Sequence, residues 1–165
     1  MKIRHMILIV KEQEMTQNLK EALINEGRPP ELFKGCTNEE IQQVMKVQNV
    51  KRLPSTFVEY LQIMGHGGIA EILLGDSADF NSMLYLKESL IDQVESYSPN
   101  FTLPNNVFVF FGHQDVEFRY FLTDNSDDDP PVFMHIIDDD DAKVVAQSFT
   151  EYLETMLNLF RKLKR

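Results

Sequence analysis

Two histidines and a carboxylate have the residue types of a metal site. His66 stands among three glycines, and His113 and Asp115 lie in a short polar stretch between two apolar runs. Two imidazoles with one carboxylate bind transition metals in many proteins. Turns also favour such residues for conformational reasons alone, and nothing in the sequence brings the two segments together. We therefore expect turn residues here, without a metal or another cofactor.

Other sequence patterns argue against catalysis. The acidic segment 124–129 resembles a calcium loop, but it lacks the glycine and the distal glutamate of an EF-hand, so only weak, adventitious calcium binding remains open. The single cysteine, Cys36, excludes an internal disulfide and a cysteine-based zinc site, and no base is assigned to it. We expect no enzyme; a metal-dependent hydrolase is a distant alternative.

Charge is distributed unevenly along the chain. The formal net charge is −10, whereas residues 53–160 hold 3 basic and 19 acidic residues, a balance of −16. Such a surface repels nucleic acid and anionic lipid and speeds encounter with basic proteins. The alternative is that the acidic residues serve only solubility.

Two acidic clusters flank one expected strand, with two further carboxylates upstream. The clusters lie at opposite ends of the strand or fold back to one rim, depending on the turns. If the clusters share one face with Asp115 and Glu117, the ten carboxylates of residues 115–141 outnumber the single basic residue, Arg119. Such a face would mimic the phosphate backbone that a nuclease binds. The alternative is a solvated loop face. The candidate partner-binding residues are Asp115, Glu117, Asp127, Asp128, Asp129, Asp138, Asp139, Asp140 and Asp141.

A second contact surface is expected around Tyr60, His66 and His113, since aromatic anchors dominate binding energy. The competing interpretation places Tyr60 in the core with its hydroxyl at the edge.

Helices are expected at both ends of the chain and in between. Residues 1–26 are mostly helical, although 1–10 are ambiguous between helix and strand. Thr37 and Glu40 form a capping box before a helix that runs to about Gln48. A helix from Pro54 ends at Gly65, Gly67 and Gly68, which permit positive φ. Weaker periodicity predicts a helix over 81–97, with extended residues at 84–86, and Ser148 and Glu151 cap the last helix.

Strands are expected at 69–74 and in the second half of the chain. The period changes to two at 107–111 and 116–122, which form a hairpin, and strands at 132–137 and 143–146 follow. Pro130 and Pro131 indicate that the third of these begins late or lies at an edge. The sequence predicts one α+β domain over 1–165, with a central, mostly antiparallel sheet wrapped by N-terminal helices and a C-terminal helix.

The order and spacing of these segments resemble the SMI1/KNR4 family (SUKH superfamily). The resemblance rests on the Leu53-Pro54 helix with Tyr60-Leu61, the glycine turn, the hairpin FVFFGHQDVEFRYF, the PPVFMH strand and the SFTEYLETM helix, and it is strongest over 37–160. One departure is Asp115-Val116 after the hairpin turn, where a glycine and an aromatic residue often stand.

The resemblance implies a non-catalytic, protein-binding module. In bacteria it implies an immunity protein of a polymorphic toxin system, which occludes the active site of a cognate, basic toxin, often a nuclease. The alternative is an adaptor or scaffold in a regulatory or cell-wall-related complex. No segment reads as a signal peptide or membrane span, so we expect a cytoplasmic protein that binds neither membrane nor nucleic acid directly.

Overall fold

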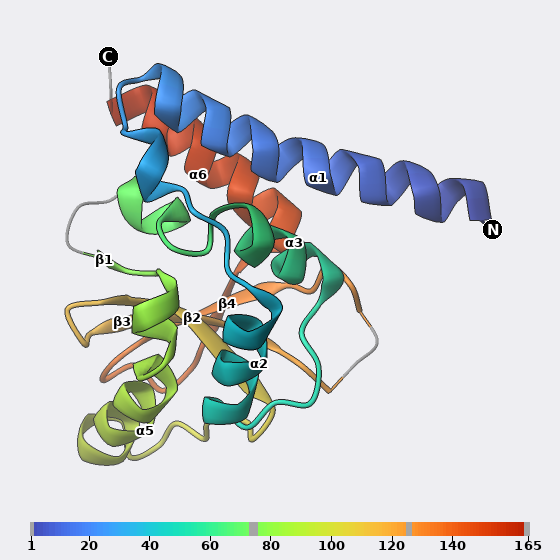
Figure 1. Ribbon diagram of the computed structural model, residues 1–165. Helices are drawn as coiled ribbons and strands as arrows, with labels where there is room; N and C mark the ends of the chain where they lie inside the picture. Colours follow the sequence, from blue (N-terminus) through green and yellow to red (C-terminus); the bar gives the residue numbers. More distant parts are fainter. Residues whose placement is uncertain (1, 73–75, 125–126, 164–165) are drawn as a thin grey trace.

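A five-stranded antiparallel sheet lies between two groups of helices (Figure 1). The computed structural model describes residues 2–72, 76–124 and 127–163, with side chains from residue 14 onward. This arrangement confirms the expected α+β class. The segment expected to be ambiguous at 1–10 is helical from residue 2.

Each strand of the sheet pairs with its neighbour in sequence, in the order β1-β2-β3-β4-β5. The strand after the two prolines is therefore internal; it begins only after them, at Val132. The strands are β1 (Asp76–Ser77), β2 (Val107–His113), β3 (Glu117–Leu122), β4 (Val132–Ile136) and β5 (Lys143–Ala146).

Helices from distant parts of the chain cover the two faces of the sheet. Helices α1 and α6 lie side by side with α3 on one face, and α5 lies on the other (Figure 1). The α-helices are α1 (Lys2–Asn25), α2 (Asn38–Val47), α3 (Ser55–Met64), α4 (Phe80–Met83), α5 (Leu86–Tyr97) and α6 (Phe149–Leu163).

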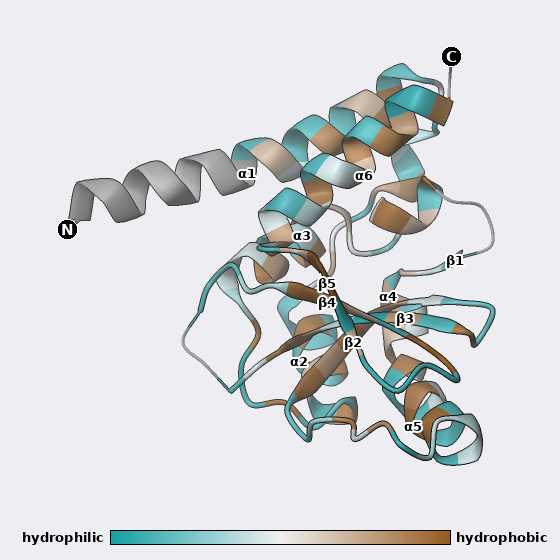
Figure 2. Cartoon of the chain, turned by 180° about the vertical axis from the view of Figure 1, so that it is seen from behind, coloured by the Kyte–Doolittle hydropathy of each residue, from teal (hydrophilic) through white to brown (hydrophobic). Residues whose placement is uncertain are grey.

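An aromatic cluster fills the space between the sheet and the α1–α3–α6 layer. The ring of Phe57 on α3 lies 5.3 Å from that of Phe108, 5.0 Å from that of Phe121 and 5.1 Å from that of Phe149. A register shift in β2 between Val109 and Phe111 interrupts the alternation there. Hydrophobic residues gather where strands and helices meet, and hydrophilic residues line the turns (Figure 2).

Two local expectations were wrong. Residues Gly68–Glu71 form a 3₁₀ helix, η2, where a strand was expected at 69–74; Leu73 and Leu74 lie outside the described residues. Residues 84–86 are not extended, because they join α4 directly to α5. Both segments are short and apolar, and periodicity cannot separate helix from strand over so few residues.

Helix boundaries follow the expected capping. The Thr37 hydroxyl accepts a hydrogen bond from the Glu40 amide, and the Glu40 carboxylate accepts one from the Thr37 amide, which confirms the capping box. At the end of α3, only Gly68 of the three glycines has positive φ, at 56°. A Cβ there would lie 2.0 Å from the Tyr60 hydroxyl, so any side chain at this position would clash.

Candidate functional site

Two turns and the start of β3 bring six acidic residues to one end of the sheet. Strands β3 and β4 pair with Glu117 opposite Ile136, so the β2–β3 turn and the β4–β5 turn share an edge. The Ile137 amide joins the turns by donating to the Val116 carbonyl at 2.8 Å. We call this surface the acidic rim; it comprises Asp115, Glu117, Asp138, Asp139, Asp140 and Asp141.

Backbone geometry and helix α5 hold the rim in place. Gln114 and Asp115 have positive φ, 51° and 55°, and the Val116 amide donates to the His113 carbonyl at 3.0 Å, which closes a tight turn. The Ser89 hydroxyl of α5 donates to the Asp115 carboxylate at 2.8 Å. Beyond the end of α5, the Ser98 hydroxyl accepts from the Asp138 amide at 2.8 Å, and Asn100 donates to the Asp140 carboxylate at 3.0 Å. The rim is therefore a fixed surface.

Basic residues neutralise the rim only in part. The Arg119 guanidinium binds the Glu117 carboxylate but turns inward, donating to the Tyr152 hydroxyl at 2.7 Å and lying 4.2 Å from the centre of the Phe111 ring. Lys143 lies 3.1 Å from a carboxylate oxygen of Asp139. Val116, which lies between Asp115 and Glu117 in the chain, is 50% exposed. An exposed apolar side chain next to negative charge suits contact with a basic protein surface.

The second acidic cluster, Asp127–Asp129, lies at the opposite end of β4. Five residues of strand separate it from the rim, which corresponds to at least about 13 Å at about 3.3 Å per residue. Asp128 and Asp129 bind other segments of the chain. Asp128 pairs with Arg52, its carbonyl accepts from the amide of Thr56, and Asp129 accepts from the amide of Thr150 in the first turn of α6. The structure thus favours opposite ends over a shared rim, and we call these three residues the tethering cluster.

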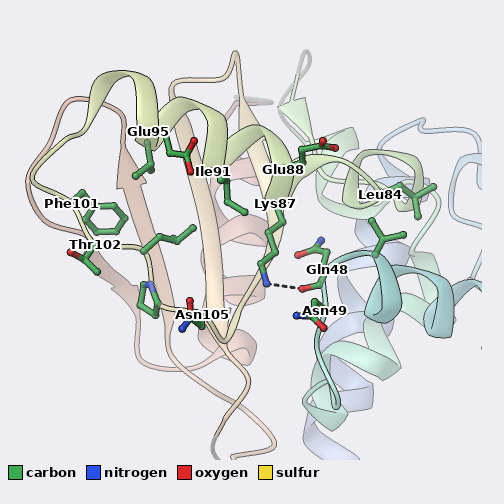
Figure 3. Close-up of a pocket in the computed structure, with 14 residues that line it drawn as sticks. Gln48, Asn49, Leu84, Lys87, Glu88, Ile91, Glu95, Phe101, Thr102 and Asn105 are labelled. Carbon is green, nitrogen blue, oxygen red and sulfur yellow. Dashed lines mark hydrogen bonds between the residues drawn. The ribbon is translucent and has the colours of Figure 1, made fainter.

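A groove of about 960 Å³ lies on another side of α5, against the end of α2 and the loop 101–105 (Figure 3). Its polar lining includes Lys87, whose ammonium donates to the carbonyl oxygens of Gln48 at 2.6 Å and Val107 at 3.0 Å. Burial lowers the pKa of Lys87. The apolar lining includes Val47, Leu84, Ile91, Phe101 and Leu103. The volume lies within the usual range for ligand pockets.

The groove has a rigid floor. Gln48 is 1% exposed, and its side chain donates to the carbonyl oxygens of Met83 at 2.8 Å and Val109 at 2.7 Å and accepts from the Val109 amide at 2.7 Å. These bonds join α2, α4 and β2. Sequence reasoning missed this groove, because its walls come from segments up to about sixty residues apart and only the fold brings them together.

Comparison with known families assigns this architecture. A profile described as the SMI1/KNR4 family (SUKH-1) matches residues 35–155. The chain belongs to the SMI1/KNR4 family. The matched region contains both rim turns, the tethering cluster and the groove, whereas α1 and the end of α6 lie outside it. Among curated proteins, none matches the chain.

Membership of the SMI1/KNR4 family supports, in general terms, a role of the immunity-protein type with protein partners. The family consists in general of non-catalytic proteins. Across the described residues, no helix has the length and hydrophobicity needed to cross a bilayer.

The residues of the expected second surface fall in different environments in this SMI1/KNR4 domain. Tyr60 is fully buried and its hydroxyl accepts from the Ile69 amide at 2.9 Å, so the core interpretation is the one supported. Burial raises the pKa of Tyr60. His113 is 44% exposed at its side chain and its Nδ1 lies 2.5 Å from a carboxylate oxygen of Asp76. The structure therefore separates Tyr60 from any exposed contact.

The two histidines do not form the site imagined with Asp115. His66 lies against Glu40, with Nε2 3.1 Å from each carboxylate oxygen, and His113 lies against Asp76. In the described part of the chain, the donor atoms that gather with His66 belong to Cys36 and Glu40. Burial, helped by the Glu40 charge, raises the pKa of Cys36 to about 12, which keeps the free thiol protonated and poorly nucleophilic at neutral pH.

Proposed function

We propose that this chain is a cytoplasmic, non-catalytic immunity protein that binds a cognate toxin domain and occludes its active site. The observation that carries the proposal is the acidic rim, six carboxylates on two adjoining turns and the first residue of β3. A nuclease binds phosphate through a basic cleft, and a rigid acidic surface competes for that cleft. In this proposal the whole chain acts as one domain and contacts neither nucleic acid nor membrane directly.

The rim supplies orientation and association rate. Long-range attraction between a negative rim and a positive cleft speeds encounter, and salt screens it over about 10 Å at 0.1 M. The exposed side chains of Val116 and, on α5, Tyr97, which are 50% and 59% exposed, supply apolar contact that slows dissociation. Of the nine carboxylates expected to bind, the proposal keeps the six of the rim and assigns the tethering cluster to the fold.

The groove favours a second candidate, an adaptor in a regulatory or cell-wall-related complex. An adaptor needs two separate binding surfaces, and the rim and the groove flank α5 on different sides. In this case loss of the acidic rim would leave binding through the groove intact. No toxin partner is required for this role.

The gene immediately upstream tests the proposal. We expect its expression alone to stop bacterial growth and co-expression with this protein to restore it. A double rim variant, Asp140→Lys with Asp141→Lys, should fail to restore growth. The matched control is Asp124→Lys with Glu154→Lys, which makes the same change in net charge at exposed positions away from the rim.

Each outcome has a clear meaning. Rescue by the control but not by the rim variant supports occlusion through the rim. Rescue by both variants contradicts the rim as the binding surface while leaving an immunity role in place. Unaffected growth with the upstream gene alone contradicts the toxin pairing and favours the adaptor.

A further inference from the structure

Cys36, Glu40 and His66 offer one sulfur, one oxygen and one nitrogen donor at a single point of the fold. These donor atoms all lie within 4.8 Å of one another. The residues come from the segment before α2, the first turn of α2 and the turn after α3. Neither the partner-binding rim nor the groove involves them, so their grouping needs a separate account.

Backbone hydrogen bonds fix two of the three donors before any ligand arrives. The Cys36 amide donates to the Leu61 carbonyl at 2.8 Å, and the His66 amide donates to the Lys34 carbonyl at 2.9 Å. The segment 34–36 is therefore bound at both of its ends to the end of α3 and the turn that follows it. Gly65 allows this approach, because a Cβ there would lie 2.4 Å from the Cys36 sulfur.

The capping box fixes the third donor. The Glu40 carboxylate accepts from the Thr37 amide at 2.8 Å, which holds it at the start of α2 facing His66. Its other oxygen, Oε1, does not take part in the capping box and is available as a metal ligand. The Cys36 residue is only 7% exposed, while the side chains of His66 and Glu40 are 24% and 29% exposed. An ion from solvent can thus enter on the side of His66 and Glu40, and the buried Cys36 thiol lies on the inner side of the site.

We propose that Cys36, Glu40 and His66 form a zinc-binding site. Sulfur, imidazole nitrogen and carboxylate oxygen are the three ligand types that Zn²⁺ takes in proteins, and a solvent molecule completes four-coordination. On binding, the Cys36 thiol gives its proton to solvent, and the zinc takes the place of the hydrogen bond that joins His66 to Glu40. The ion would join the segment before α2 to the end of α3.

A second histidine–carboxylate pair in the same molecule provides the control. His113 and Asp76 make a comparable contact, but the described residues place no third donor within reach of them. If a histidine–carboxylate pair alone bound zinc, both pairs would bind. If the thiol is needed, only the His66 pair will bind.

Metal titration of the whole, untagged chain tests the site. After treatment with a chelator, the protein is titrated with Zn²⁺ in competition with a chromophoric chelator, and separately with Co²⁺. We expect one zinc per chain and, with Co²⁺, a thiolate-to-metal charge-transfer band. Cys36→Ser and His66→Gln should weaken zinc binding at least about tenfold, in line with the sensitivity of metal sites to their supporting groups. His113→Gln should bind as the wild type does.

The outcomes separate the site from general metal binding. A charge-transfer band in the wild-type protein identifies the thiolate as a ligand without relying on the folding of any variant. Circular dichroism checks each variant. Lack of stoichiometric zinc binding, or undiminished binding by folded Cys36→Ser, would overturn the proposal, as would loss of binding in His113→Gln. Zinc should also raise the unfolding temperature of the wild type and not that of Cys36→Ser.

Discussion

The acidic rim and the tethering cluster are similar in sequence and opposite in use. Both are runs of aspartate next to the same strand, but they make different contacts. Asp129 accepts from α6 through its carboxylate and Asp128 accepts from Thr56 of α3 through its carbonyl, whereas the side chains of Asp140 and Asp141 are exposed. The difference shows that a carboxylate's role depends on which donors the fold places beside it.

The largest expected effect concerns association with a basic partner. Replacing Asp140 and Asp141 by lysine should lower the association rate constant at least about tenfold at low salt, within the range ascribed to electrostatic steering. The rate for the wild type should fall steeply as salt is raised, and that for the variant should fall less. Stopped-flow mixing with the toxin domain measures both; equal salt slopes would contradict steering by the rim.

The tethering cluster should respond in stability instead. Asp129→Ala removes the acceptor for the Thr150 amide at the start of α6, and loss of such a cap costs about 1 kcal/mol in the free energy of unfolding. Urea denaturation should show this loss, while the partner's association rate stays that of the wild type. A variant with normal stability and impaired binding would reverse the roles that we assign to the two clusters.

Acid should weaken the support beneath the rim. His135 is buried, its ring stacks 3.8 Å from that of Phe101, and burial lowers its pKa despite the opposing charge of Asp139. The unfolded chain then binds a proton more readily than the folded one, so stability present above about pH 6.5 is lost as the pH falls. We expect the free energy of unfolding to fall from pH 7.5 to pH 5.5, and His135→Gln should flatten this dependence in urea unfolding at pH 7.5, 6.5 and 5.5.

The smallest effect is expected at the ion pair of Arg52 and Asp128. Both side chains are more than a third exposed, so solvent screens their attraction. Asp128→Asn should lower the free energy of unfolding by a few tenths of a kcal/mol, and the difference should shrink at high salt. Thermal unfolding at two salt concentrations measures this; a larger, salt-independent loss would contradict a solvent-screened ion pair.

Features of the fold that depend on local patterns were predictable from sequence. The capping box at Thr37 and the alternation through Phe118 and Tyr120 follow from residues a few positions apart, and both were confirmed. The antiparallel pairing of β2 with β3 also follows from the hairpin expected at 107–122. The 3₁₀ helix after Gly68 was missed, because a few apolar residues carry no usable period.

Features of the site that depend on distant contacts were not predictable. Whether the acidic turns share an end depends on strand pairing, and the grouping of Cys36, Glu40 and His66 depends on backbone bonds from Lys34 to His66 and from Cys36 to Leu61. The sequence argument against a cysteine-based zinc site considered cysteine ligands alone, whereas the site that we propose adds donors of other types. A histidine and a glutamate complete the set, one of them thirty residues away in the chain.

The meander also bears on how the chain folds during synthesis. Every strand pairs with the one made just before it, so the sheet can assemble from neighbouring hairpins, and such local pairing favours rapid folding. The contact between α1 and α6 joins the two ends of the sequence and must form last. Until α6 emerges from the ribosome, the apolar side chains of α1, such as Leu19 and Leu23, are not fully buried. Chains released before α6 is made would expose apolar surface that chaperones and proteases recognise.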